Sequence, residues 1–239
     1  MTAIAMFPLG TVLLPHMPLP LRILESRYLV MLGRLLDDEQ PEFGVVLIER
    51  GGEAGGNDHR FGVGTLARIT RVIPRSDDVQ LIAVGGRRFE VTRWLEDDPH
   101  PAGEIRFLPE LTWSDDLEDL REHAEKIVRR VLSVSAEFAD TSWDPDIALS
   151  DDPVEASWQL AGIAPLGPID QLRLLRSEST RELLTTLIEL TEAAEPTLTA
   201  AGGESALDAE LERLLDAGDD GPADGPAADD SDEPGPIAP

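Results

Sequence analysis

The 239-residue chain contains no cysteine, which excludes disulfide bonds and thiolate chemistry. It also has no apolar run near the roughly 20 residues that a membrane-spanning helix needs. Its first residues carry no basic segment ahead of an apolar one, which is the pattern of a signal peptide. We therefore expect a cytoplasmic protein that makes no contact with a membrane.

Lysine is almost absent, and Lys126 is the only one. No G-x-x-x-x-G-K-[S/T] motif occurs, so the sequence offers no phosphate-binding loop, and no G-x-S-x-G motif occurs either. Lys126 is also the only residue that could serve as the base of a Ser-Lys peptidase, and it lies on an amphipathic helical pattern with nothing to activate it. The four histidines lack the spacing of metal ligands. We predict a protein that is not an enzyme and binds no metal or cofactor.

Positive charge is scarce as well, because 47 acidic residues outnumber 20 basic ones and give a net charge of −27. Residues 1–113 are close to balanced, and most of the excess acid follows residue 113. Such acidity opposes binding to a phosphate backbone. The composition therefore disfavours nucleic acid as a partner.

The pattern of residues 6–36 organises the first part of the chain. A short apolar run at residues 12–14 predicts a buried strand, and Pro15, Pro18 and Pro20 then exclude a helix. From Glu25 the apolar residues recur with helical spacing over about three turns. One face of this predicted helix carries Tyr28, Met31, Leu32, Leu35 and Leu36.

Short β-branched segments with glycine bends follow and predict a small curled sheet. The predicted strands are residues 43–49, 61–73, 79–84, 88–92 and 104–108, with Gly85-Gly86 separating two of them. After Trp113 the apolar period becomes helical, and Ser114 is a suitable helix cap. Further helices are predicted at residues 154–163 and 169–175, and a last one begins with a capping box of Ser179 and Glu182.

The end of the chain, residues 196–239, is rich in proline, glycine, alanine and aspartate and predicts a disordered acidic tail. A short amphipathic segment at residues 204–215 is the exception, and it could dock on the body or on a partner. We therefore divide the chain into a β-rich part, residues 1–113, a helical bundle, residues 114–195, and the tail.

Several groups of residues near the start recur at a fixed spacing: Phe7-Pro8-Leu9, Leu14-Pro15, Leu19-Pro20-Leu21 and Ile23-Leu24-Glu25-Ser26-Arg27-Tyr28. Together they resemble the start of the Lon protease N-terminal domain, which typically reads FPL, LFPG, PL and IFEPRY. This chain has His16, Leu24 and Ser26 where the family usually has glycine, phenylalanine and proline. The resemblance continues through residues 62–67, 85–91 and 174–187, and it covers residues 5 to about 192.

The resemblance implies an α+β fold, in which a pseudo-barrel related to the PUA domain precedes a helical bundle. It also implies recognition of unfolded or extended polypeptide, either as an adaptor of a protease or independently of one. The ATPase and peptidase modules that follow this domain in full-length Lon have no counterpart in the sequence. The client and the oligomeric state do not follow from the sequence.

Two groups of residues are candidates for binding. The first is the Pro-Met segment, with Leu14, His16, Met17 and Leu19, where we expect Met17 and His16 to be exposed to an apolar polypeptide. The second is a basic patch, with Arg68, Arg71, Arg87 and Arg88, which would suit an RNA-binding PUA-like module. The plainer alternatives are that the first group is core and that the arginines pair with the acidic helices. An enzyme with scattered catalytic residues is the third reading of function.

Overall fold

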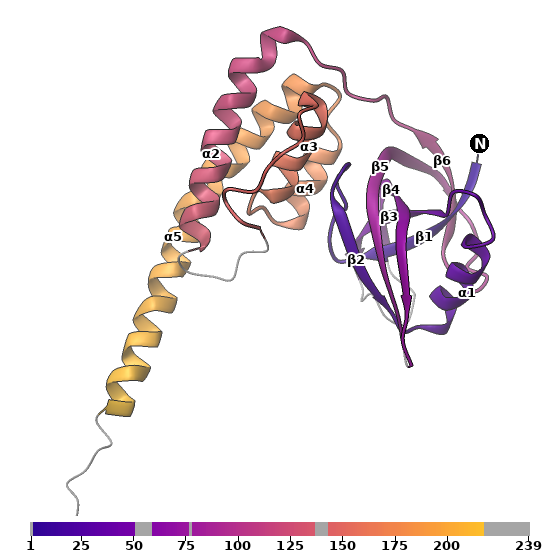
Figure 1. The fold of residues 1–239 in the computed structure, drawn as a ribbon, viewed down its shortest axis with the longest axis horizontal. Helices are drawn as coiled ribbons and strands as arrows, with labels where there is room; N and C mark the ends of the chain where they lie inside the picture. Colours follow the sequence, from indigo (N-terminus) through magenta and orange to yellow (C-terminus); the bar gives the residue numbers. More distant parts are fainter. Residues whose placement is uncertain (1, 51–58, 77, 137–142, 218–239) are drawn as a thin grey trace, which may run out of the picture.

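The computed structural model describes residues 2–50, 59–76, 78–136 and 143–217. It has two parts, a β-barrel with one helix packed against it and a bundle of helices that follows it in the chain (Figure 1). This arrangement confirms the predicted α+β class, with a barrel first and helices after it.

Six strands of the described residues form one sheet: β1 (Thr2–Leu9), β2 (Pro18–Ile23), β3 (Glu42–Arg50), β4 (His59–Pro74), β5 (Val79–Trp94) and β6 (Ala102–Phe107). Their order is β2-β5-β4-β3-β1-β6, and β6 also pairs with β5. The 16-residue strand β5 makes this possible, because residues 79–84 pair with β2 and residues 89–94 pair with β6. Five strands therefore close into a ring, and β2 extends the sheet at one end.

Two strand predictions were wrong. Residues 12–14 are not a strand, although Leu13 and Leu14 are buried, because their apolar side chains fill the core from an irregular segment. The first strand is β1 instead. Gly85-Gly86 does not separate two strands either, since it lies inside β5 at a shift of register between Thr65↔Arg88 and Ala67↔Gly85, which is a bulge.

Helix α1 (Ser26–Leu35) matches the predicted helix and buries Tyr28, Met31 and Leu32 against the barrel. The Tyr28 ring stacks on Phe7 of β1, with 4.0 Å between the ring centroids. Leu36 departs from the prediction, since it is 47% exposed rather than part of the buried face. The helix ends at Leu35, and the capping residue Leu36 turns away from the core.

A 3₁₀ turn (Asp115–Leu117) opens the bundle, which contains α2 (Glu118–Ala136), α3 (Pro153–Ile163), α4 (Pro168–Leu175) and α5 (Thr180–Ala217). The Ser114 side chain does not cap the 3₁₀ turn as predicted, because its hydroxyl donates to the Asp116 carboxylate. The Ser179 hydroxyl does cap α5, since it accepts a hydrogen bond from the Glu182 N–H at 3.2 Å. The Glu182 carboxylate accepts from the Glu178 N–H rather than from Ser179.

Helix α5 continues past residue 195, where we predicted the helical part to end. It runs through Pro196 to Ala217 and so includes the segment 204–215. The rest of the predicted disordered tail, residues 218–239, lies outside the described residues. Within the described ranges, no helix is both long and apolar enough to cross a membrane.

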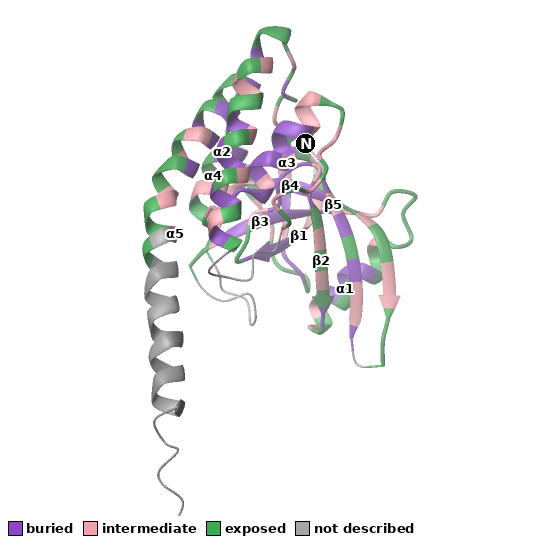
Figure 2. Ribbon diagram, turned by 60° about the vertical axis from the view of Figure 1, so that its left-hand side comes forward, coloured by how far each residue is buried: buried purple, intermediate pink, exposed green. Residues whose placement is uncertain are grey.

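Buried residues occur both in the strands of the barrel and in the helices of the bundle (Figure 2). Their apolar side chains form one cluster that includes both parts. It joins Phe43 and Leu81 of the barrel to Trp158, Leu174 and Leu187 of the bundle. A second, smaller cluster around Met6 and Phe89 fills the barrel. The larger core contains residues from both sides of residue 113, so barrel and bundle hold one another in place. The division of the chain into domains at that residue stays a prediction.

Candidate functional site

The turn at residues 14–17 lies on the bulge of β5. The His16 N–H donates to the Gly85 carbonyl at 2.8 Å, and the Gly85 N–H donates to the Met17 carbonyl at 2.9 Å. A Cβ at Gly85 would lie only 2.2 Å from the Leu14 carbonyl oxygen, so only glycine allows this close approach. The turn also places His16 at φ 62°, in the left-handed region that favours glycine.

The same turn buries Met17, which corrects our expectation that this residue is exposed. Met17 is 7% exposed and Leu14 is 2% exposed. The Met17 thioether lies against Gly162 of α3, where a Cβ would come within 2.5 Å of its sulfur. The Pro-Met segment is therefore largely core between barrel and bundle. Leu19 is half-buried in β2, and His16 keeps 38% of its side chain exposed.

Arg88 also joins the two parts, and it is buried rather than part of a surface patch. Its guanidinium donates to the carbonyls of Leu175 at 2.9 Å, Ser177 at 2.6 Å and Pro109 at 2.7 Å. Burial lowers the pKa of Arg88, and the nearby Glu182 carboxylate raises it. Three of its N–H groups are thus committed to main-chain oxygens, and Arg88 is not free to bind an external phosphate.

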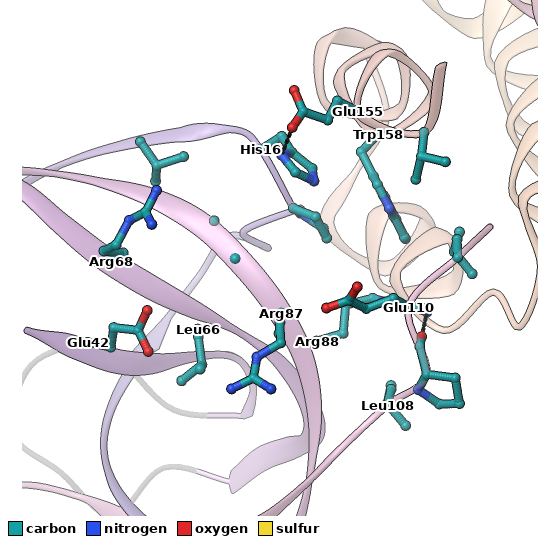
Figure 3. Close-up of a pocket in the computed structure, with 17 residues that line it drawn as sticks. His16, Glu42, Leu66, Arg68, Arg87, Arg88, Leu108, Glu110, Glu155 and Trp158 are labelled. Atoms are coloured by element: carbon teal, nitrogen blue, oxygen red, sulfur yellow. Dashed lines mark hydrogen bonds and ion pairs between the residues drawn. The ribbon is translucent and has the colours of Figure 1, made fainter. Parts of the chain in front are cut away.

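A cleft of about 440 Å³ lies between β4 and β5 of the barrel, the segment after β6, and α3 (Figure 3). Its apolar wall consists of Leu66, Val84, Leu108, Leu111 and Trp158. Its charged or titratable side chains are those of His16, Glu42, Arg68, Arg87, Glu110 and Glu155, together with the committed Arg88. A concave site with an apolar wall and a few polar groups is the usual form of a binding site.

The rim of the cleft at α3 is fixed by contacts. The His16 Nδ1 lies 3.4 Å from the Glu155 Oε1, and the Ser150 hydroxyl donates to the Glu155 Oε2 at 2.9 Å. Glu155 is in the first turn of α3, where the Asp152 carboxylate accepts hydrogen bonds from the N–H groups of Val154 and Glu155. The cap on α3 therefore positions the carboxylate that faces His16.

The structure thus brings together residues from both predicted groups, because His16, Arg68 and Arg87 line one cleft. Arg71 is exposed on β4 but does not line it. Glu155 and Trp158 were not among the predicted site residues, and both come from α3, about 140 residues after His16. The start of a helix at residue 153 was predictable, but no local signal places its first turns beside His16. Within the described ranges, no three His, Asp or Glu side chains gather as metal ligands.

We expect the left-handed backbone of residue 16 to separate two variants that remove the same imidazole. Both His16→Gly and His16→Ala lose the contact with Glu155, but alanine keeps a Cβ at φ 62° and glycine does not. His16→Gly should therefore be more stable than His16→Ala by about 1 kcal/mol in urea unfolding. Equal stability of the two variants would contradict the left-handed assignment.

The family model of the ATP-dependent protease La (LON) substrate-binding domain matches residues 3–193. Among solved structures, a Lon N-terminal domain protein from Xanthomonas campestris is 25% identical, with a TM-score of 0.55, covering 78% of this chain and 98% of that chain. The N-terminal domain of the Lon protease of the Mycobacterium avium complex shares 18% identity and the fold, with a TM-score of 0.57, covering 80% of this chain and 98% of that chain. No curated protein matches the sequence.

These findings agree with the resemblance carried by the FPL, LP and ILESRY segments of the sequence. The family model covers both the barrel and the helices that follow it, up to the first turns of α5. The chain therefore belongs to the family of Lon substrate-binding domains.

Proposed function

We propose that this chain is a non-enzymatic module that binds unfolded or extended polypeptide in the cleft between barrel and α3. We propose further that it can present such polypeptide to a protease as an adaptor. Membership of a substrate-binding family supports the kind of ligand. The single observation that carries the place of binding is the cleft itself, which combines an apolar wall with charged side chains on its rim.

The cleft suits a polypeptide because its two kinds of lining match the two parts of an extended chain. Val84 and Leu108, which are half-buried, offer apolar surface to a side chain. Main-chain N–H and C=O groups of a ligand can pair with the carboxylates and guanidinium groups on the rim, such as Glu110 and Arg68. Because barrel and bundle share one core, the cleft is formed before the ligand arrives, which lowers the entropic cost of binding.

The alternative of an RNA-binding module has less support than it had from the sequence. Of the four arginines of the proposed patch, Arg88 is buried and bound to three carbonyls, and Arg71 lies outside the cleft. Glu42 and Glu110 share the cleft with the remaining arginines, Arg68 and Arg87. A polyanion would meet these carboxylates together with a net charge of −27.

We expect Gly86→Leu to block binding of a denatured model polypeptide without unfolding the protein. Gly86 lines the cleft, and a Cβ there would have only an ordinary contact, 3.5 Å from the Leu66 carbonyl oxygen. A leucine side chain would then fill part of the cleft, and the dissociation constant should rise about tenfold or more, which fluorescence anisotropy would measure.

Gly62→Leu is the matched control. Gly62 lies on β4, which pairs with β5, but it does not line the cleft. A Cβ at Gly62 would have no atom within 4 Å, so the leucine side chain can be accommodated there. It should bind the polypeptide as the unchanged protein does. Equal binding by both variants would place the polypeptide elsewhere on the molecule. Met17→Asp is not a useful test, since Met17 is buried and a charge there would destabilise the fold.

A further inference from the structure

We infer that the cleft selects polypeptides through a carboxylate group, which Arg68 and Arg87 hold next to an apolar side chain of the ligand. This inference rests on the proposed function and names the chemistry of the ligand. The group is either the C-terminal carboxylate of a chain or the side chain of a single Asp or Glu within an apolar segment.

Both guanidinium groups lack an acidic partner in the part of the chain that the structure describes. Arg68 and Arg87 are exposed and line the cleft, and neither has a carboxylate oxygen within 4 Å among the described residues. Other exposed arginines of this acidic chain, such as Arg93, Arg106 and Arg181, pair with carboxylates of the protein. Arg68 and Arg87 are therefore available to an external anion.

The Phe107 ring holds the Arg87 side chain in place. Arg87 has its guanidinium 3.7 Å from the centroid of the Phe107 ring, which leaves the N–H edges of the plane free. Arg68 is on β4, in register with Glu42 of β3 on one side and Val84 of β5 on the other. The fixed guanidinium of Arg87 can bind a carboxylate through two parallel hydrogen bonds, and Arg68 presents a second, exposed guanidinium in the same cleft.

The acidic groups of the same cleft restrict which anions it can accept. The Glu155 carboxylate contacts the His16 imidazole and accepts a hydrogen bond from the Ser150 hydroxyl. Glu42 and Glu110 line the cleft without an ion pair in the described structure. These two carboxylates limit the negative charge that the cleft accepts. A single carboxylate can lie against Arg68 and Arg87, while a run of phosphates or acidic residues would meet Glu42 and Glu110.

The apolar wall completes the site. The half-buried Val84 and Leu108 line the cleft together with Arg68 and Arg87, so an apolar side chain beside the carboxylate would be removed from water there. This combination favours a chain that ends in an apolar residue over a free small acid. The ligand class is thus an apolar polypeptide segment that carries one carboxylate.

The test uses the full chain and three fluorescent peptides of serine and leucine that end in Leu. One has a free C-terminal carboxylate, one has a C-terminal amide, and one has the amide and a single internal Glu. We expect the free acid to bind about tenfold more tightly than the plain amide in anisotropy titrations. Arg68→Gln and Arg87→Gln should each remove this difference between the acid and the amide.

Arg71→Gln is the matched control, since Arg71 is exposed on the same strand as Arg68, has no ion pair in the described residues, and lies outside the cleft. It should keep the full preference for the acid. Unfolding curves of all three variants should superimpose on that of the unchanged protein, because each side chain is exposed.

The outcomes separate the inference from the function on which it rests. Tight binding of the internal Glu peptide would identify a side-chain carboxylate, and weak binding would identify the chain terminus; both support the inference. Equal binding of all three peptides would overturn it and leave polypeptide binding intact. Failure of all three peptides together with the denatured polypeptide would overturn the proposed function. Tighter binding of a structured RNA, lost in Arg68→Gln, would overturn the inference in favour of phosphate.

Discussion

Arg88→Met is expected to lower the free energy of unfolding by about 3–5 kcal/mol. Methionine preserves much of the length of the side chain but donates no hydrogen bond. The carbonyls of Leu175, Ser177 and Pro109 would then lose a charged donor within a region that excludes water. Urea unfolding followed by far-ultraviolet circular dichroism measures the loss.

The neighbouring residue provides the control for this prediction. Arg87 is exposed and contacts the Phe107 ring rather than main-chain carbonyls, so Arg87→Met should cost less than about 1 kcal/mol. If Arg88→Met lost as little as Arg87→Met, the hydrogen bonds of Arg88 would not hold barrel and bundle together. The two variants therefore separate a structural arginine from a binding one.

Gly85→Ala should lower the free energy of unfolding by about 3 kcal/mol. The added Cβ would lie 2.2 Å from the Leu14 carbonyl oxygen and 3.0 Å from its carbon, so the main chain of the turn at residues 14–17 would have to move. That movement would also disturb the hydrogen bonds of Gly85 with His16 and Met17. The same urea measurement applies.

Gly86→Ala, at the next position, tests whether the effect comes from the close approach. A Cβ at Gly86 meets the Leu66 carbonyl oxygen at 3.5 Å, an ordinary contact, and no strained φ is present there. Its cost should stay below about 1 kcal/mol. Similar losses at the two glycines would show that any side chain disturbs the bulge, and that the Leu14 carbonyl is not the cause.

The elements that the sequence predicted well are those whose signal is local. Tyr28, Met31 and Leu32 follow the helical period, and the structure buries all three in α1. Ser179 lies three residues before Glu182, and it caps α5. Periodicity and capping act between residues a few positions apart, so one sequence is sufficient to detect them.

The parts that were missed depend on contacts between distant residues. Met17 between prolines has the sequence of an exposed loop, and it is buried because Gly162, 145 residues later, leaves room for its thioether. Arg88 lies among other arginines in the sequence and so was predicted to belong to a basic patch. It is buried because three carbonyls from other segments surround its guanidinium. The residues next to Met17 and Arg88 in the sequence give no indication of these distant partners.

The end strand of the sheet has a consequence for how the protein behaves at high concentration. Strand β2 pairs with β5 through residues 18–23, and Pro18 and Pro20 occupy alternate positions in it. Neither proline has an N–H, so the outward edge of β2 lacks two of the donors that an added strand would need. A second molecule therefore cannot extend the barrel sheet at this edge by a regular ladder of hydrogen bonds. The two prolines protect the native protein against edge-to-edge aggregation.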